Sequence, residues 1–193
     1  ERTNDPMQQG DLDSRMILQT AFFANGLSAA YSQPFSQYHQ QNSLLERIQT
    51  IFQTFQKLQT PQGGLFLPPN KKTGEVNIHH IAMAYKALIH SYHAIEDSLD
   101  ETTKQKYKTF LKKGLDFLHN RPIRQISHKG MVWAGVMALG YQFTGEQTYQ
   151  NEALEAMSWL KSAIGRSGEL NIPSLLITRN STLFVQYLFL YRI

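Results

Sequence analysis

The 193-residue sequence contains no cysteine, so neither disulfide bonds nor thiolate chemistry contributes to its fold or function. It also lacks an apolar run close to the roughly 18 residues that suggest a membrane span. The most apolar stretch, near the C-terminus, is interrupted by Arg179, Asn180 and Gln186. We therefore expect no membrane-spanning segment.

Sequence motifs of several common chemistries are missing as well. No GxxxxGK[ST], GxGxxG or GxSxG pattern occurs, and no aspartate-rich DxDD or DDxxD motif of isoprenoid enzymes. His90 and His93 have helical i, i+3 spacing, but neither they nor the pair His79 and His80 has a carboxylate partner at a fixed spacing. The sequence therefore predicts neither a metal site nor a bound cofactor.

The charged residues are few and dispersed. The net charge is +4 and the isoelectric point is about 9.2. The only basic cluster lies on what we interpret as a solvated helix face, and no aromatic residues interleave with it in the manner of a nucleic-acid interface. We expect no nucleic-acid partner, whereas an acidic ligand remains compatible with the charge. The cluster consists of Lys104, Lys106, Lys108, Lys112 and Lys113.

What the sequence does contain is a recurring apolar segment that ends in tyrosine. The four copies close at Tyr31, Tyr92, Tyr141 and Tyr191, in steps of 61, 49 and 50 residues. A unit of roughly 50 residues accommodates two helices and their connections, which is typical of helical repeat architectures. The sequence therefore predicts stacked helical pairs.

Apolar periodicity predicts about seven helices in one domain over residues 1–193, with a frayed polar tail over 1–10. Asp11 or Asp13 would cap the first helix and Asp100 the fourth. In the sixth helix we expect Tyr149, Ala153, Ala156, Met157 and Leu160 to face inward. The expected ranges are about 11–31, 43–59, 78–95, 100–121, 127–143, 146–164 and a seventh helix from about 176.

The odd-numbered helices are apolar nearly all round, whereas the even-numbered ones each show one polar face. A helix that is apolar on all sides is buried, and an amphipathic one lies outside. We therefore expect an all-α fold of antiparallel hairpins, with the odd helices in an inner layer and the even ones in an outer layer. The last helix ends at Ile193 without a stop signal, so we expect further helices, or a second domain, to complete the arrangement.

Three stretches resemble the (α/α) toroids of polysaccharide lyases, of the chondroitin AC and heparinase II/III types, and of many glycoside hydrolases. They are RMILQTAFFANGLSAAYSQPFSQYH from Arg15, HKGMVWAGVMALGYQFTGEQTY from His128, and the turn LQTPQGGLF from Leu58. A complete toroid has about twelve helices, so the resemblance implies a partial or open ring. It further implies a secreted bacterial protein, periplasmic or extracellular, that binds or cleaves a polysaccharide or oligosaccharide.

The repeat register places polar residues at the start of each inner helix from the third onward. Stacking would gather these starts at one mouth, where helix N-termini favour anionic or hydroxyl ligands. Tyr85 and Trp133 lie within two turns and would offer aromatic surfaces to sugar rings. The alternative is that such residues merely cap helices. The expected site residues are Asn77, His79, His80, His128, Lys129, Arg179 and Asn180.

Three functions remain open from the sequence. In a lyase acting on uronate polymers, the resemblance implies His79 or His128 as the base, and Arg179 or Asn180 as the group that neutralises the carboxylate. A glycosidase needs two carboxylates, for which the candidates are Asp11, Asp13, Glu75 and Glu169, with Glu75 and Glu169 as one pair. The third alternative is a non-catalytic helical-repeat module that binds a protein or supports a neighbouring domain.

Overall fold

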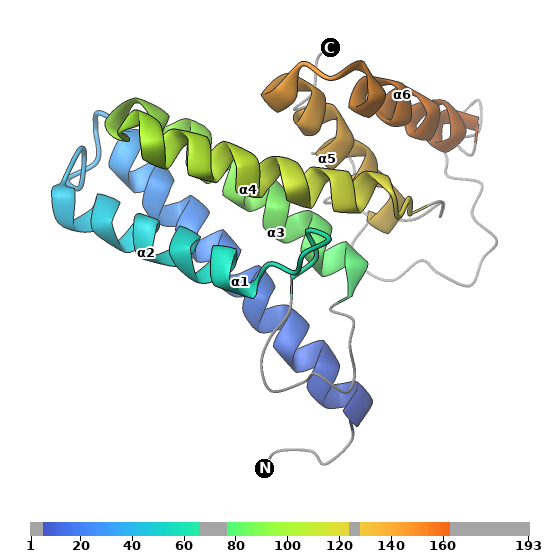
Figure 1. Cartoon of the computed structure of the whole chain (residues 1–193), viewed down its shortest axis with the longest axis horizontal. Helices are drawn as coiled ribbons and strands as arrows, with labels where there is room; N and C mark the ends of the chain where they lie inside the picture. The colour runs from blue at the N-terminus through green and yellow to red at the C-terminus, as the bar shows by residue number, and fades with distance from the viewer. Residues whose placement is uncertain (1–5, 66–76, 124–127, 163–193) are drawn as a thin grey trace.

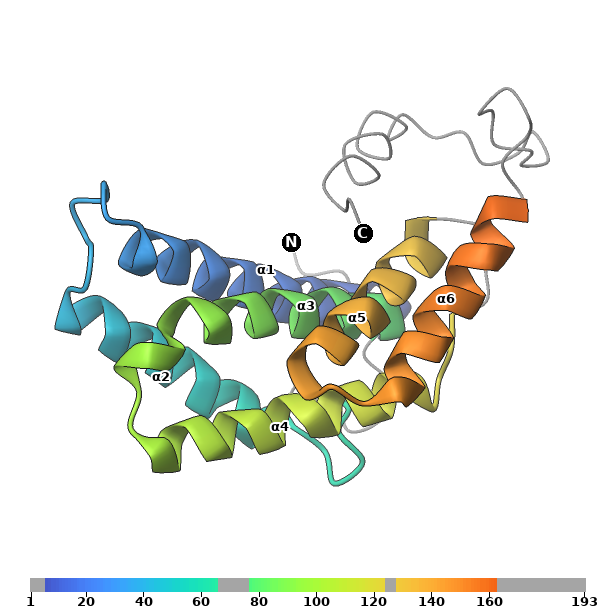
Figure 2. The same ribbon diagram turned by 90° about the horizontal axis from the view of Figure 1, so that it is seen from above.

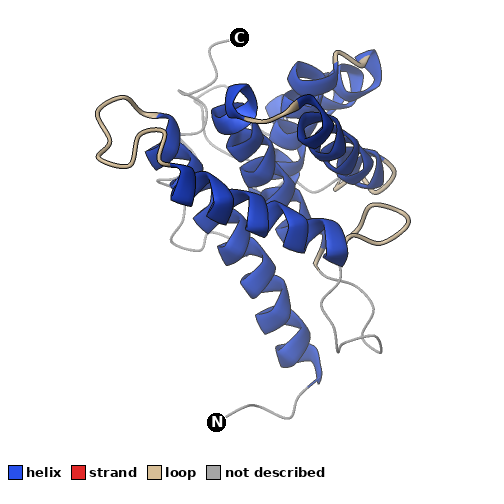
Figure 3. Ribbon diagram, turned by 60° about the vertical axis from the view of Figure 1, so that its left-hand side comes forward, coloured by secondary structure: helices blue, strands red, loops and turns tan. Residues whose placement is uncertain are grey.

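The structure, a computed structural model, describes residues 6–65, 77–123 and 128–162. Over these ranges the fold is all-helical, with one isolated bridge between Gln59 and Leu65 (Figure 1; Figure 3). The elements are α1 (Pro6–Ser32), α2 (Asn42–Leu58), α3 (Ile78–Ile95), the 3₁₀ helix η1 (Glu96–Ser98), α4 (Glu101–His119), α5 (His128–Thr144) and α6 (Gln147–Ser162).

The packing follows the alternation of apolar and amphipathic helices. Helix α1 packs against α3, and α3 packs against α5. Helix α2 lies on α1, α4 contacts both α3 and α5, and α6 pairs with α5. Figure 2 shows α1, α3 and α5 in succession, with α2, α4 and α6 along their outer side. The core therefore forms between the two sets of helices.

The outer helices contribute one apolar face each. In α2 this face consists of Leu44, Ile48, Phe52 and Phe55, all buried. The Phe52 ring stacks on Tyr107 of α4, with ring centroids 4.4 Å apart. Offset stacking of this kind adds to the free energy gained from burying the two rings. The contact joins the two outer helices α2 and α4.

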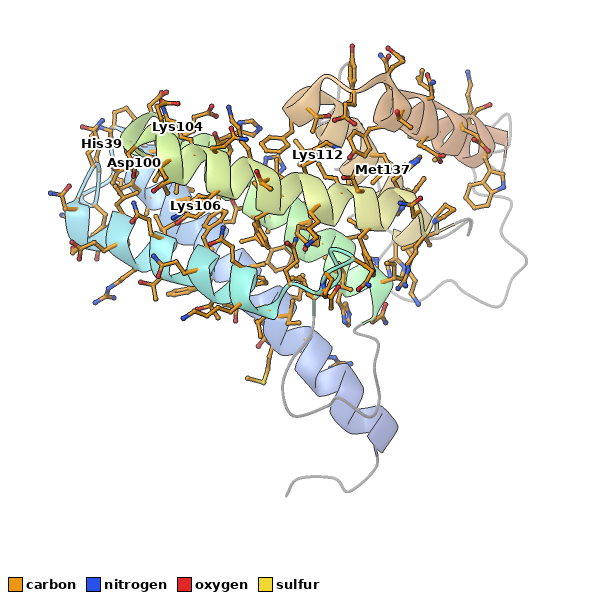
Figure 4. All side chains as sticks on the ribbon, viewed as in Figure 1. His39, Asp100, Lys104, Lys106, Lys112 and Met137 are labelled. Carbon is orange, nitrogen blue, oxygen red and sulfur yellow. The ribbon has the colours of Figure 1, made fainter. Side chains whose placement is uncertain are left out.

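Side-chain caps define where α3 and α4 begin. Asn77 Oδ1 accepts a hydrogen bond from the His79 backbone N–H, and Asp100 Oδ1 accepts one from the Thr103 backbone N–H. Each bond satisfies a donor that has no partner inside its own helix. The predicted Asp100 cap is confirmed (Figure 4), and α3 has the bounds expected from the sequence.

The turn after α2 is held by a buried tyrosine. Gly63 has φ +98°, and a Cβ at this position would lie 2.1 Å from the Lys113 carbonyl oxygen of α4. The Tyr85 hydroxyl of α3 donates to the Gly63 carbonyl oxygen over 2.6 Å. Gln59 Nε2 donates both to the Tyr85 hydroxyl and to the Phe110 carbonyl oxygen. These bonds tie α2, α3 and α4 together at one point.

Some expectations differ from the structure or fall outside it. Helix α1 begins at Pro6, so residues 6–10, expected in a frayed tail, are helical, and Asp11 and Asp13 lie within the helix instead of capping it. Proline is tolerated there because the first helical N–H groups have no partner within the helix. The predicted seventh helix lies outside the described residues. Among the described helices, none is long and apolar enough to cross a membrane.

Candidate functional site

The first residues of α3 and α5 come together at one end of the molecule. The ring centroids of His79 and His128 are 5.0 Å apart in an edge-to-face arrangement. The ring of His80 lies 5.8 Å from that of His79. Lys129 follows His128 and contributes to the electrostatic environment of His79. We call these four residues the histidine cluster.

The members of the histidine cluster differ in their exposure. His79 is only 6% exposed, whereas His128 is exposed and His80 and Lys129 are half-buried. His79 Nδ1 is buried and has no hydrogen-bond partner among the described residues. A buried polar atom without a partner costs about 1 to 3 kcal/mol in folding free energy. Such an atom is a candidate contact for a ligand.

Burial, together with the positive charges of His128, His80 and Lys129, lowers the pKa of His79 from 6.5 to about 4. The imidazole is therefore neutral at neutral pH. A neutral imidazole has one donor and one acceptor nitrogen. Nδ1 of His79 is therefore able to accept a proton, or to hold a hydrogen bond with a ligand hydroxyl or carboxylate.

The electrostatics of the cluster favour an anion. Every charged group that shifts the pKa of His79 in the described structure is a cation when protonated. The cluster also lies at the N-termini of α3 and α5, where the helix dipoles are positive. A bound carboxylate would offset the mutual repulsion of these groups.

Asn77 stands next to the cluster and has a structural task. Its side chain caps α3 through the backbone N–H of His79. The residue is exposed. Asn77 therefore sets the backbone position from which His79 and His80 project.

The two aromatic residues expected to face a sugar are packed inside. Tyr85 is 0% exposed and holds the turn at Gly63. Trp133 is 2% exposed, and its Nε1 donates to the Leu118 carbonyl oxygen of α4 over 3.1 Å. Neither ring presents a surface at the mouth. In this structure both serve the contacts of α4 with its neighbours.

The remaining expected residues lie where the structure gives no placement. Arg179 and Asn180 fall outside the described ranges, as do the two acids of the glycosidase alternative, Glu75 and Glu169. The structure therefore brings together His79, His80, His128 and Lys129, with Asn77 beside them.

No set of three histidine, aspartate or glutamate residues within the described ranges is arranged to hold a metal ion. This applies to the histidine cluster and to the pair His90 and His93. His93 Nδ1 instead lies 3.3 Å from Glu96 Oε2.

Sequence reasoning missed several exposed apolar side chains. In α1, Met16, Phe22 and Phe23 are 59%, 46% and 60% exposed. In α6, Met157 was expected to face inward, but it is 43% exposed. Its position in the helical pattern lies at the margin of the apolar face, where periodicity alone does not separate buried from exposed residues.

Comparison with known protein families, with characterised proteins and with solved structures finds no match for this chain. We therefore infer the function from the geometry of the site.

Proposed function

We propose that the protein is a carbohydrate-active domain whose histidine cluster binds a carboxylate-bearing polysaccharide, such as one containing uronate. The observation that carries this proposal is the contact of His79 with His128. It joins the starts of two neighbouring helices into one basic site that contains a buried nitrogen without a partner. We propose further that this polymer is met in the periplasm or outside the cell.

The proposed architecture is a partial (α/α) toroid. The succession of contacts from α1 to α3 to α5, with α2, α4 and α6 outside them, supports this arrangement. In such an arc the starts of the inner helices lie at one end, and the contact between His79 of α3 and His128 of α5 agrees with this expectation. Further helices, or a second domain, would complete the ring.

The proposed reaction is β-elimination. A base removes the proton on C5 of the uronate, the bond between C4 and the glycosidic oxygen breaks, and a C4–C5 double bond forms while the leaving oxygen takes up a proton. A cation beside the carboxylate stabilises the negative charge that develops during proton removal. We assign this role to Lys129, and Arg179 or Asn180 would share it. His79 or His128 would be the base.

Elimination is better supported than hydrolysis. A glycosidase requires two carboxyl groups on opposite sides of the scissile bond. The described groups that act on His79 are all basic, with no carboxylate among them. Neutral imidazole, in contrast, is a suitable base for an elimination.

Binding and cleavage can be tested separately. Calorimetry with polygalacturonate should show binding that is absent with a neutral glucan of similar length. The variant K129A should weaken this binding about tenfold or more, because one cation at a partly desolvated site is lost. The control K106A removes an exposed lysine of α4 and should leave binding unchanged. Equal binding of both polymers, or none, would overturn the proposal.

The reaction itself is followed by the ultraviolet absorbance of the unsaturated uronate product. Growth of this absorbance supports elimination, and its loss in H79Q or H128Q would identify the base. Binding without any growth of absorbance means that the domain only binds the polymer.

A non-catalytic interaction module is the second candidate. It is favoured by the exposed apolar side chains of α1, above all Phe23, and by Phe35, which is 89% exposed in the loop after α1. Exposed aromatic residues are enriched at protein interfaces. The variant F23S should abolish binding of a partner protein while leaving polygalacturonate binding unchanged.

A further inference from the structure

One flank of α6 presents apolar side chains to solvent. Leu154 is 58% exposed and Met157, one turn later, is 43% exposed. Glu152, in contrast, lies on the side of α6 that faces α4, with its Oε1 3.8 Å from His119 Nδ1. At 100° per residue, Leu154 and Met157 point away from that side. They therefore mark the flank of α6 that is remote from α4.

Helix α5 has a stripe of half-buried small and apolar residues. Met131, Gly135 and Ala138 follow each other at i, i+4 and i+7, and all three are half-buried. A Cβ at Gly135 would meet no atom within 4 Å. Small residues along a stripe allow a neighbouring helix to approach closely. We call Met131, Gly135, Ala138, Leu154 and Met157 the open edge.

The chain itself contains a segment suited to this edge. Thirty-one residues follow Ser162, where α6 ends. Residues 181–191 of this stretch, STLFVQYLFLY, are mainly apolar and carry no charge. They repeat the apolar pattern of residues 131–141 in α5 at a spacing of 50. A helix over 178–193 would be about 24 Å long, which is close to the length of α5.

We propose that residues 178–193 dock as a helix on the open edge, beside α5 and α6. The apolar side chains of the segment would cover Leu154 and Met157, and Gly135 and Ala138 would allow the close approach. Because the segment is tethered to α6, its effective concentration at the edge is on the order of millimolar, which favours it over a second copy of the chain. The proposal goes beyond the proposed function and does not depend on any ligand.

The repeat spacing has a consequence for the mouth. It aligns Arg179 with Lys129 of α5 and with His80 of α3. A segment docked in this register would bring the Arg179 guanidinium to the same end of the molecule as the histidine cluster.

Hydrogen exchange of the 193-residue chain tests the docking. We expect amides of residues 181–191 to exchange at least about tenfold more slowly than in an unstructured peptide. The double variant L154D/M157D should remove this protection, because a carboxylate at the interface would be buried without a partner. The control T148D adds a charge at an exposed position of the same helix that, at 100° per residue, lies on the side away from Leu154 and Met157, and it should leave the protection unchanged.

Two results would overturn the proposal: peptide-like exchange of residues 181–191 in the parent chain, or protection that survives L154D/M157D. Protection of α2 and α4 amides in the same experiment shows whether the variant has folded. If it has not folded, a photoreactive phenylalanine analogue at position 157 of the otherwise unchanged chain decides the question. Capture of residues 178–193 of the same molecule supports docking, whereas capture of a second copy, of α1 or of no segment contradicts it.

Discussion

The turn after α2 and the histidine cluster are both places where polar groups are buried between helices, yet they are built in opposite ways. At the turn, the hydroxyl of Tyr85 donates to Gly63 and accepts from Gln59, whose Nε2 also reaches the Phe110 carbonyl. At the cluster, His79 Nδ1 is buried without a partner, and the neighbouring groups are all basic. A satisfied network specifies structure, whereas an unsatisfied one is available for a ligand.

We expect the largest effect on stability from a substitution at Gly63, in the turn after α2. Alanine there would have to adopt φ +98° and would clash with the Lys113 carbonyl oxygen. We expect G63A to lower the free energy of unfolding by about 3 kcal/mol, measured by urea denaturation. The control G26A, at a helical position with nothing within 4 Å of a Cβ, should instead raise it by up to about 1 kcal/mol. Equal effects of the two variants would contradict the steric role that we assign to Gly63.

The next effect concerns the hydroxyl that closes the same turn. Y85F would leave the Gly63 carbonyl oxygen without its donor inside the core, so we expect a loss of about 2 kcal/mol in the free energy of unfolding. Y38F removes a hydroxyl from a ring that is 47% exposed and should cost less than about 0.5 kcal/mol. If Y85F cost as little as Y38F, the network would not be a source of stability.

In the histidine cluster, His79 should make the free energy of unfolding depend on pH. Its pKa is about 4 in the folded state and 6.5 when unperturbed, so the unfolded chain binds more protons between these values. Above pH 6.5 the ring is neutral in both states, and the free energy of unfolding has its full value. As the pH falls to 4, the unfolded chain takes up the proton first, so the free energy of unfolding decreases. Allowing for solvent near the ring, we expect a loss of about 1 to 2 kcal/mol over this window.

Urea denaturation at several pH values measures this contribution. H79Q should have a smaller slope than the parent chain between pH 4 and 6.5, while H93Q, at the exposed end of α3, provides the control. Identical slopes for the parent chain and H79Q would show that burial does not lower the pKa of His79.

We expect the smallest effect on stability at the helix cap beside the histidine cluster. N77A removes the acceptor of the His79 backbone N–H, and D100A removes the matching acceptor of Thr103 at α4. Each should cost about 1 kcal/mol in the free energy of unfolding. Because Asn77 also holds the position of the cluster, N77A alone should weaken polygalacturonate binding, as calorimetry would show. Equal binding by both variants would mean that the Asn77 cap has only a structural role.

The sequence predicted the elements of the fold better than the use of individual side chains. The bounds of α3 and the Asp100 cap follow from apolar periodicity and capping chemistry, which are local properties. The proximity of the His79 and His128 starts followed from the spacing of the closing tyrosines, because equal spacing implies equivalent positions in stacked units. Local patterns were sufficient where the structure repeats.

Burial was harder to predict for side chains that contact a second segment of the chain. Tyr85 and Trp133 were expected to serve a ligand, but Gly63 and Leu118 use their polar atoms inside the core. These contacts join segments that are far apart in the sequence, so periodicity contains no signal for them. Met157 was misplaced for a related reason, because its exposure depends on which neighbour covers the flank of α6.

Trp133 also gives the protein an internal optical reporter. The chain has two tryptophans. Trp133 is buried between α4 and α5, and its indole N–H donates to the Leu118 carbonyl oxygen. An indole shielded from water fluoresces at shorter wavelength than a hydrated one, so separation of α4 from α5 would shift its emission to the red. With Trp159 replaced by phenylalanine, the colour of that emission would follow the integrity of this junction during unfolding without any added dye.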